Sequence, residues 1–265
     1  MKLIILLCSL PFIALSQSTR SSVSLSTGGA GVASIDPGEA TFVNPAAIMH
    51  LRGRYFFSTV QKDSFALSLI ENDPASAMPG AIGYESWKSW EAFGLSLAER
   101  AWGRLAMGLN FKYFQLKPED REEKRTQMFN GNLGLTWAFS RQFAMGAAFE
   151  NISEIDDRFK ANTDLEPRTR LGLNYIYKDW FRLRLDGSTS KNNNYQNWVP
   201  QMGFETSFGQ WMVGRMGWFR EPGYAESWTA GFGLSMPRFK LDYAYQDVNS
   251  EQTEIRHSID LGVPF

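Results

Sequence analysis

The feature that most constrains this chain is a strict alternation of apolar and polar residues. In residues 181–186, Phe, Leu and Leu occupy the odd positions, and Arg, Arg and Asp occupy the even ones. The same alternation recurs in residues 105–113, 133–139, 143–149, 171–177, 228–234, 239–245 and 255–265. Because successive side chains of a β-strand point to opposite faces, each set lies on one face of a strand. The chain is therefore predicted to be all-β.

The length of these segments separates a membrane barrel from a soluble sandwich. Strands of soluble domains usually run about five or six residues, whereas about nine to eleven tilted residues cross a bilayer. The segments here run about nine to thirteen residues. Their apolar faces carry many aromatic residues, and their other faces carry Gly, Ser, Thr, Asn and charge. A lipid-facing exterior and a polar lumen predict a transmembrane antiparallel β-barrel.

The connections give an independent check on the strand count. About fourteen strands are expected, near residues 54–60, 63–71, 78–86, 90–99, 102–116, 126–140, 142–151, 167–178, 180–189, 196–208, 210–220, 226–236, 238–247 and 253–265. Short turns, such as 99–101, 178–179 and 236–237, alternate with longer polar loops, such as 117–126 and 151–166. An even-stranded membrane barrel has this pattern of short and long connections. Residues 72–77 are the exception, so the first four strands are the least constrained.

Composition excludes two other classes of protein. The chain has 265 residues, with 27 Lys and Arg against 28 Asp and Glu, and a net charge of -1. This balance gives no basic surface for a nucleic-acid partner. Beyond the first sixteen residues, no apolar run approaches the roughly eighteen residues of a transmembrane helix.

Residues 1–16 are predicted to be a signal peptide. Lys2 precedes the apolar stretch 3–15, and Ala14-Leu15-Ser16 has the form of a cleavage site. Cys8, the single cysteine, lies within this stretch, and the residues before it lack the small side chain that usually precedes a lipid-modified cysteine. The mature chain therefore has no cysteine for a disulfide or a thiolate metal site.

Residues 17–53 do not alternate, and we expect them to form a unit separate from the barrel of residues 54–265. Gly28, Gly29 and Gly31 permit tight backbone conformations. Asp36-Pro37-Gly38 predicts a turn. Asn44-Pro45 predicts an N-cap followed by proline at the first helical position, with a short helix through residues 46–49.

This glycine-rich stretch, acidic turn and Asn-Pro-Ala-Ala helix start, placed before about fourteen strands, resemble the FadL-type outer-membrane transporter superfamily. That superfamily includes long-chain fatty acid transporters and the PorV and PorQ barrels of a secretion system. The resemblance implies that residues 17–53 fold inside the lumen as a hatch, built on Gly28, Gly29, Gly31, Asp36, Asn44 and Pro45. It also implies a location in the bacterial outer membrane, among lipid and lipopolysaccharide.

The end of the chain fits the same resemblance. Phe265 closes an alternating apolar strand, which is similar to the C-terminal signal that the barrel-assembly machinery reads. Pro264 departs from that pattern, although a strand terminus tolerates a residue without an N–H donor.

Pro79 and Gly80 stand near the start of the third expected strand. In FadL-type transporters, a kink in the third strand opens the wall so that a hydrophobic ligand leaves sideways. Proline removes a hydrogen-bond donor and glycine weakens a strand, which favours a lateral opening here. Alternatively, the two residues simply end the preceding turn.

Charged residues are expected to face the lumen on several neighbouring strands. They are Arg182, Arg184, Asp186, Arg238, Lys240, Asp242, Arg256 and Asp260. Buried charges are tolerated when they are paired or hydrated. We expect these residues to pair with one another and with the hatch, and the alternative is an ion-selective ring.

Two functions remain open at this stage. The first is passive transport of a small hydrophobic compound, and the second is a PorV- or PorQ-like scaffold or shuttle that serves a secretion-system partner. The charged loop 117–126 differs from the long apolar outer loops of the fatty acid transporters, which argues against fatty acid capture. We interpret it as a solvated loop near lipopolysaccharide, and the alternative is a specific receptor site. With a hatch inside about fourteen strands, we expect low ion conductance.

An enzyme is disfavoured. Of the two histidines, His50 follows the expected hatch helix and His257 faces lipid by the alternation. Residues 94–98 lack the last glycine of a Gly-x-Ser-x-Gly motif. The sequence shows no paired spacing of metal ligands, and no cofactor or catalytic residue is predicted.

Overall fold

The structure, a computed structural model, describes residues 19–74, 78–117, 126–162, 165–191, 198–220, 226–248 and 254–265. The expected signal peptide, with Cys8, and most of the charged loop 117–126 lie outside the described residues. Within the described part of the chain, no helix is both long and apolar enough to cross a membrane.

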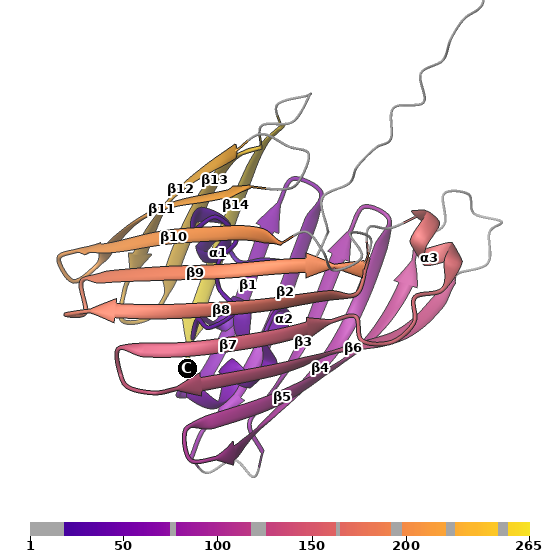
Figure 1. Cartoon of the computed structure of the whole chain (residues 1–265), viewed down its shortest axis with the longest axis horizontal. Coiled ribbons are helices and arrows are strands. Elements are labelled where there is room, and N and C mark those ends of the chain that lie inside the picture. Colours follow the sequence, from indigo (N-terminus) through magenta and orange to yellow (C-terminus); the bar gives the residue numbers. More distant parts are fainter. Residues whose placement is uncertain are drawn as a thin grey trace, which may run out of the picture.

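Fourteen antiparallel strands close into one barrel (Figure 1). The strands are β1 (Gly53–Gln61), β2 (Ser64–Asn72), β3 (Gly80–Trp87), β4 (Trp90–Trp102), β5 (Leu105–Leu116), β6 (Gln127–Ala138), β7 (Phe143–Glu150), β8 (Arg168–Tyr177), β9 (Phe181–Ser190), β10 (Val199–Phe208), β11 (Met212–Arg220), β12 (Glu226–Ser235), β13 (Lys240–Val248) and β14 (Glu254–Pro264). Each strand pairs with its neighbours in sequence, and β1 pairs with β14 to close the cylinder. The predicted fold class is confirmed.

One predicted turn between strands is wrong. Residues 99–101 lie within β4, and the chain turns at Gly103 and Arg104 instead. Gly103 adopts a φ of 55°, a left-handed conformation that glycine reaches without strain. The polar pair Glu99 and Arg100 is exposed at the end of the strand, so it resembles a turn in sequence.

The two faces of the wall have opposite character. Outward side chains on the strands are apolar and exposed, for example Leu109, Phe111 and Ile259. Inward side chains are polar and buried, for example Asn110 and Ser258. A soluble protein buries its apolar residues, so this inverted arrangement requires lipid outside the barrel. The structure therefore confirms a transmembrane barrel.

The long connections meet at one end of the barrel. The connections from β5 to β6 and from β7 to β8 are both at this end, and the latter contains α3 (Asp157–Asn162). The sequence did not predict α3. The connections at the opposite end, such as β4 to β5 and β8 to β9, are short. This end also holds the start of β1 and the end of β14.

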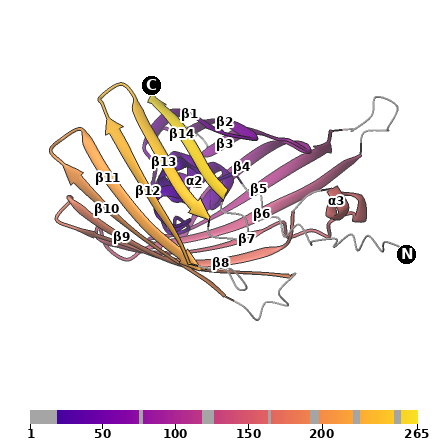
Figure 2. The same cartoon turned by 90° about the horizontal axis from the view of Figure 1, so that it is seen from above.

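The N-terminal segment, residues 19–52, lies inside the barrel (Figures 1 and 2). It contains α1 (Ser22–Ser26), α2 (Pro37–Phe42) and the 3-10 helix η1 (Pro45–His50). Between residues 21 and 48, every residue is buried except Ile35 and Pro37, which are half-buried.

The local structure of this segment follows its capping residues. Asn44 caps η1, its side chain accepting a hydrogen bond from Ala46 N at 3.2 Å, and Pro45 opens the helix as expected. The predicted turn at Asp36-Pro37-Gly38 is instead the start of α2. Asp36 occupies the N-cap position, but its carboxylate makes no capping hydrogen bond because it is engaged by side chains of the wall and by Ser34.

Inward-facing glycines let the segment approach the wall. Gly108 on β5 pairs with Gly134 on β6, and Gly203 on β10 pairs with Gly217 on β11. A Cβ atom at Gly108 would lie 2.5 Å from Ala46 N, closer than side chains tolerate. The backbone of the segment therefore rests directly on the backbone of the wall.

Candidate functional site: the charged cluster around the N-terminal segment

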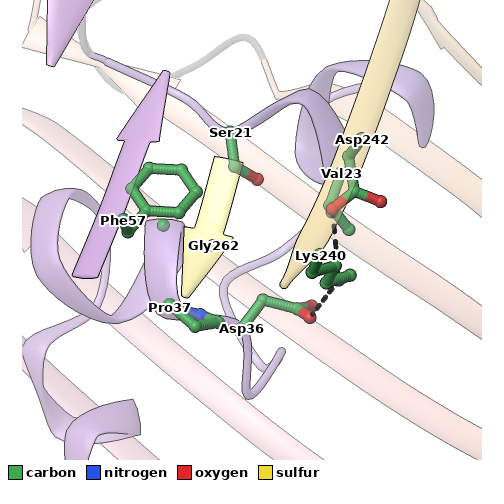
Figure 3. A pocket seen from close by; sticks show the side chains of 9 residues that line it. Ser21, Val23, Asp36, Pro37, Phe57, Lys240, Asp242 and Gly262 are labelled. Atoms are coloured by element: carbon green, nitrogen blue, oxygen red, sulfur yellow. Dashed lines mark ion pairs between the residues drawn. The ribbon is translucent and has the colours of Figure 1, made fainter. Parts of the chain in front are cut away.

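Asp36 connects the N-terminal segment to the wall. Its Oδ2 atom lies 3.0 Å from Arg184 Nη2 and 3.7 Å from Arg182 Nη1, both on β9. Its Oδ1 atom lies 3.6 Å from Lys240 Nζ on β13, a pair drawn in Figure 3. Ser34 Oγ donates a hydrogen bond to Oδ2 at 2.5 Å. One carboxylate thus contacts two strands that are not neighbours.

Asp36 is ionised in this environment. Burial alone would raise the pKa of its carboxyl, but the charges of Arg184, Lys240 and Arg182 outweigh that effect and hold the pKa well below its usual range. The contacts are therefore ion pairs at any physiological pH.

The ion pairs extend along the wall. Glu205 on β10 contacts Arg215 Nε on β11 at 2.6 Å, and both Arg182 and Arg184 at 3.4 Å. Arg215 Nη1 also lies 2.8 Å from Asp242 Oδ1 on β13. We call this set the Asp36 cluster: Asp36, Arg182, Arg184, Glu205, Arg215, Lys240 and Asp242. Breaking a buried ion pair by removing one partner typically costs about 3–5 kcal/mol.

Two predicted charges hold the segment in another way. Asp186 Oδ2 accepts hydrogen bonds from Gly31 N at 2.7 Å and Val32 N at 2.9 Å. Asp260 accepts from Ser22 N at 2.6 Å and from Ser22 Oγ at 2.7 Å. These two carboxylates bind the N-terminal segment mainly through its backbone N–H groups, and neither is a member of the Asp36 cluster.

The other two predicted charges lie elsewhere. Arg238 is exposed in the turn before β13, two residues before that strand begins. Arg256 is half-buried on β14 and pairs in register with Gln246 on β13. The structure therefore does not bring these two residues into the Asp36 cluster.

Sequence reasoning missed Glu205 and Arg215. Glu205 is the one charged residue of β10, and Arg215 shares β11 with Arg220 only, so neither stands out as part of a charged pattern. Their inward direction could nevertheless have been predicted from the alternation, because the adjacent Phe204 and Met216 are apolar and face outward.

Glu39 on α2 is a second buried carboxylate in the segment. Ser21 Oγ lies 2.8 Å from its Oε1 and 2.7 Å from its Oε2. Burial, with a further contribution from the nearby Asp36 charge, raises the pKa of Glu39 to about 7. The contact between the start of α1 and the middle of α2 therefore includes a group that titrates near neutral pH.

The opposite side of the segment makes apolar contacts with β2, β3 and β4. Ala40, Ala47, Ile48 and Leu51 of the segment pack in one cluster with Ile70, Ala81 and Ala98 of the wall. Around a barrel of fourteen strands, β2 and β3 lie half a turn from β9 and β10. The segment is thus held by charges on one side and by small apolar side chains on the other.

The wall is continuous at Pro79 and Gly80. Gly80 pairs with Glu71 on β2 and with Leu97 on β4. Ala98 N donates to Pro79 O at 3.0 Å. A Cβ atom at Gly80 would lie 2.7 Å from Ser96 O, so the glycine brings two strands close together. Among the described residues of β2, β3 and β4, the structure shows no lateral opening. Pro79 ends the connection before β3, and Gly80 is the first residue of that strand.

Comparisons with known proteins give the fold. No family model matches the chain, and no curated protein matches it. The toluene transporter TbuX of Ralstonia pickettii is similar in structure, with a TM-score of 0.71 and 12% identity over 94% of this chain and 99% of that chain. The toluene transporter TodX of Pseudomonas putida has a TM-score of 0.70 and 10% identity over 94% and 99%.

A FadL homologue of Pseudomonas aeruginosa gives a similar result, with a TM-score of 0.69 and 12% identity over 95% of this chain and 100% of that chain. At sequence identities this low, the structural similarity shows the fold alone. The lipid-facing surface, together with this fold, supports the expected location in the bacterial outer membrane. The chain therefore has the fold of the FadL-type outer-membrane channels.

Proposed function

We propose that this protein is a passive outer-membrane channel for small hydrophobic compounds, in which the N-terminal segment acts as a hatch. The observation that carries the proposal is the unequal attachment of the segment, which is ionic towards β9–β13 and apolar towards β2–β4. The likeness to proteins described as toluene transporters and as a monoaromatic hydrocarbon channel supports it.

The apolar side offers the more favourable route. A hydrocarbon beside the Asp36 cluster would separate charges from their partners, which is costly in a buried site. Between α2 or η1 and strands β2–β4, the solute meets side chains such as Ala47, Ile48 and Ala98. The solute makes new apolar contacts with these side chains in place of the contacts that it separates, so the free energy changes little. We therefore place the route on this side, with the ion pairs as the fixed edge of the hatch.

The secretion alternative has no support from these structural likenesses, which are to transport channels. Likewise, nothing in them favours an enzyme.

A pair of cysteines tests both the function and the route. Thr41 Oγ1 on α2 lies 3.2 Å from Ser68 Oγ on β2, so Thr41→Cys with Ser68→Cys places two thiols across the proposed route. Cells that lack their own channel of this kind would produce the full-length protein, and the uptake of radiolabelled toluene would be measured. We expect uptake several-fold above that of cells without the protein, abolished when the disulfide forms and restored by a reductant.

The matched control links two strands of the wall only. Thr59 Oγ1 on β1 lies 3.3 Å from Ser258 Oγ on β14, and Thr59→Cys with Ser258→Cys should leave uptake unchanged when oxidised. Uptake no faster than in cells without the protein would overturn the proposed function. Undiminished uptake through the oxidised Thr41–Ser68 pair would overturn the proposed route.

A further inference from the structure

An aromatic cluster lies inside the barrel at the end with the long connections. Its buried residues are Trp90, Ala92, Phe114, Leu116, Met128, Ile155, Phe159 and Leu165, with Trp87 packed against them. We call it the outer aromatic cluster. The ring centroids of Trp90 and Phe114 lie 5.3 Å apart, and the ring of Phe159 meets Phe114 edge-on at 6.4 Å.

A small cavity of about 10 Å³ lies against this cluster. Its apolar wall consists of Trp90, Phe114 and Leu165. Its polar wall consists of Glu85, Lys112, Asn132, Glu150 and Asn151. Since one water-sized group needs about 10–15 Å³, the cavity has room for a single hydroxyl.

Two polar atoms of the lining residues have no hydrogen-bond partner among the described residues. Lys112 Nζ donates to Glu85 Oε1 at 2.7 Å, which leaves Glu85 Oε2 unpaired. Trp90 Nε1 is also unpaired. Glu85 and Trp90 are 3% and 1% exposed, so bulk water does not satisfy these atoms. Unpaired buried groups of this kind are rare and costly.

The two atoms have complementary needs. The carboxylate oxygen of Glu85 requires a donor, whereas the indole N–H of Trp90 requires an acceptor. A hydroxyl supplies both. A hydrocarbon supplies neither, and a ligand carboxylate would be a third carboxylate in the cavity, beside Glu85 and Glu150.

We propose that Glu85 and Trp90 form a subsite for the hydroxyl of a small hydroxylated aromatic compound, such as a phenol. This inference rests on the proposed channel function and names a substrate class for it. The hydroxyl donates to Glu85 Oε2 and accepts from Trp90 Nε1, and the aromatic ring lies against Trp90 and Phe114.

The ring takes the place of side chains from the connection between β7 and β8. Ile155 and Leu165 of this connection and Phe159 of α3 close the cluster. A phenol ring that replaces the Phe159 ring against Phe114 keeps an aromatic contact, and the binding free energy has to include the cost of exposing the side chain of Phe159, which is 0% exposed in the structure. The hydroxyl then pairs two groups that a toluene molecule would leave unpaired, which is the basis for discrimination.

Calorimetric titration of the purified full-length protein with phenol and with toluene tests this subsite. We expect phenol to bind about tenfold more tightly than toluene, the ratio that one additional well-placed polar contact provides. Trp90→Phe removes the N–H but keeps an aromatic ring, and Glu85→Gln removes the charge but keeps the shape. Each should weaken phenol binding about tenfold and leave toluene binding within about twofold.

Trp87→Phe is the matched control. Trp87 stacks on Trp90 with ring centroids 5.8 Å apart, but its Nε1 donates to Thr19 Oγ1 at 3.2 Å and it does not line the cavity. This variant should leave the ratio of the two affinities unchanged. A shift in heat-modified electrophoretic mobility would verify that each variant forms a folded barrel.

Three results would overturn the subsite: equal affinities in the wild-type protein, equal losses for both compounds in Trp90→Phe, or a structure with phenol present in which only water occupies the cavity. The channel function is tested separately by toluene uptake. If the cells take up toluene but the purified protein binds phenol and toluene equally, the subsite alone is refuted. If the protein prefers phenol but the cells take up no toluene, the channel function alone is refuted.

Discussion

Arg184 Nη2 lies 3.0 Å from Asp36 Oδ2, and both side chains are buried in the lumen. The two residues are 148 positions apart, one in the N-terminal segment and the other on β9. The same guanidinium nitrogen also lies 3.4 Å from Glu205 Oε2. Asp36 is thus the member of the Asp36 cluster that comes from the N-terminal segment, and the other members lie on strands of the wall.

Replacing Asp36 should loosen the attachment of the N-terminal segment to the wall. Asp36→Asn removes the charge that Arg182, Arg184 and Lys240 share, and we expect it to weaken docking of the segment by about 3 kcal/mol or more. Planar-bilayer recordings should show larger or more frequent ion conductance than the wild-type protein. Asp63→Asn is the control, because Asp63 is exposed in the turn between β1 and β2. Wild-type conductance in Asp36→Asn would contradict the anchoring role.

Docking of the segment should weaken as pH rises. In the folded state the pKa of Glu39 is raised from 4.5 to about 7, so the folded protein binds more protons than the unfolded chain between these values. The free energy of unfolding therefore falls as pH rises through this window, by about 3 kcal/mol at most.

Glu39→Gln should remove this dependence. Its midpoint of thermal unfolding should exceed that of the wild-type protein at pH about 8 and differ little at pH about 4, since the wild-type carboxyl is then protonated. The exposed Glu154→Gln serves as the control. If Glu39→Gln and the wild-type protein keep a constant difference across the range, Glu39 does not titrate as described.

A single methyl group on the inner wall should displace the segment. In Gly108→Ala, the new Cβ would lie 2.5 Å from backbone atoms of Pro45 and Ala46, and such overpacking typically costs about 1–3 kcal/mol. Hydrogen exchange of the amides in η1 should be faster in this variant. Gly262→Ala is the matched control, because its nearest neighbour, Lys240 Cβ, lies at 3.7 Å. Equal exchange in the two variants would refute close packing at Gly108.

Phe265 should matter for assembly of the barrel. Phe265 is exposed, and its N donates to Arg54 O at 3.1 Å beside β1. Deleting Phe265 should lower the amount of folded barrel in the outer membrane, measured by heat-modified electrophoretic mobility. Phe208→Ala, at another exposed strand end, should assemble normally. Wild-type levels after the deletion would exclude a recognition role for Phe265.

The barrel could be predicted because its signal is local. The alternation that places Leu183 outward and Arg184 inward depends only on adjacent residues and on the geometry of a strand. The same parity gives the direction of a side chain but not its partner. No pattern in the sequence shows that Arg184 meets Asp36, because their contact depends on the path of residues 19–52 through the lumen.

The prediction from local sequence was also wrong where one short motif is compatible with two structures. An Asp-Pro-Gly sequence is typical of a turn, yet Asp followed by proline equally suits the first positions of a helix. At Asp36 the structure has the helix, because the carboxylate binds Arg184 and Ser34. The polar and small residues of the N-terminal segment resemble those of any loop, so they do not show where it lies. Its location in the lumen was implied only by the FadL-type resemblance.

The last strand unites two roles. β14 closes the cylinder against β1, and the same strand carries Asp260, which binds the start of α1 through Ser22. The strand that completes the cylinder therefore also holds the chain that precedes β1. The contacts that close the barrel and the contacts that hold α1 in the lumen thus depend on one strand.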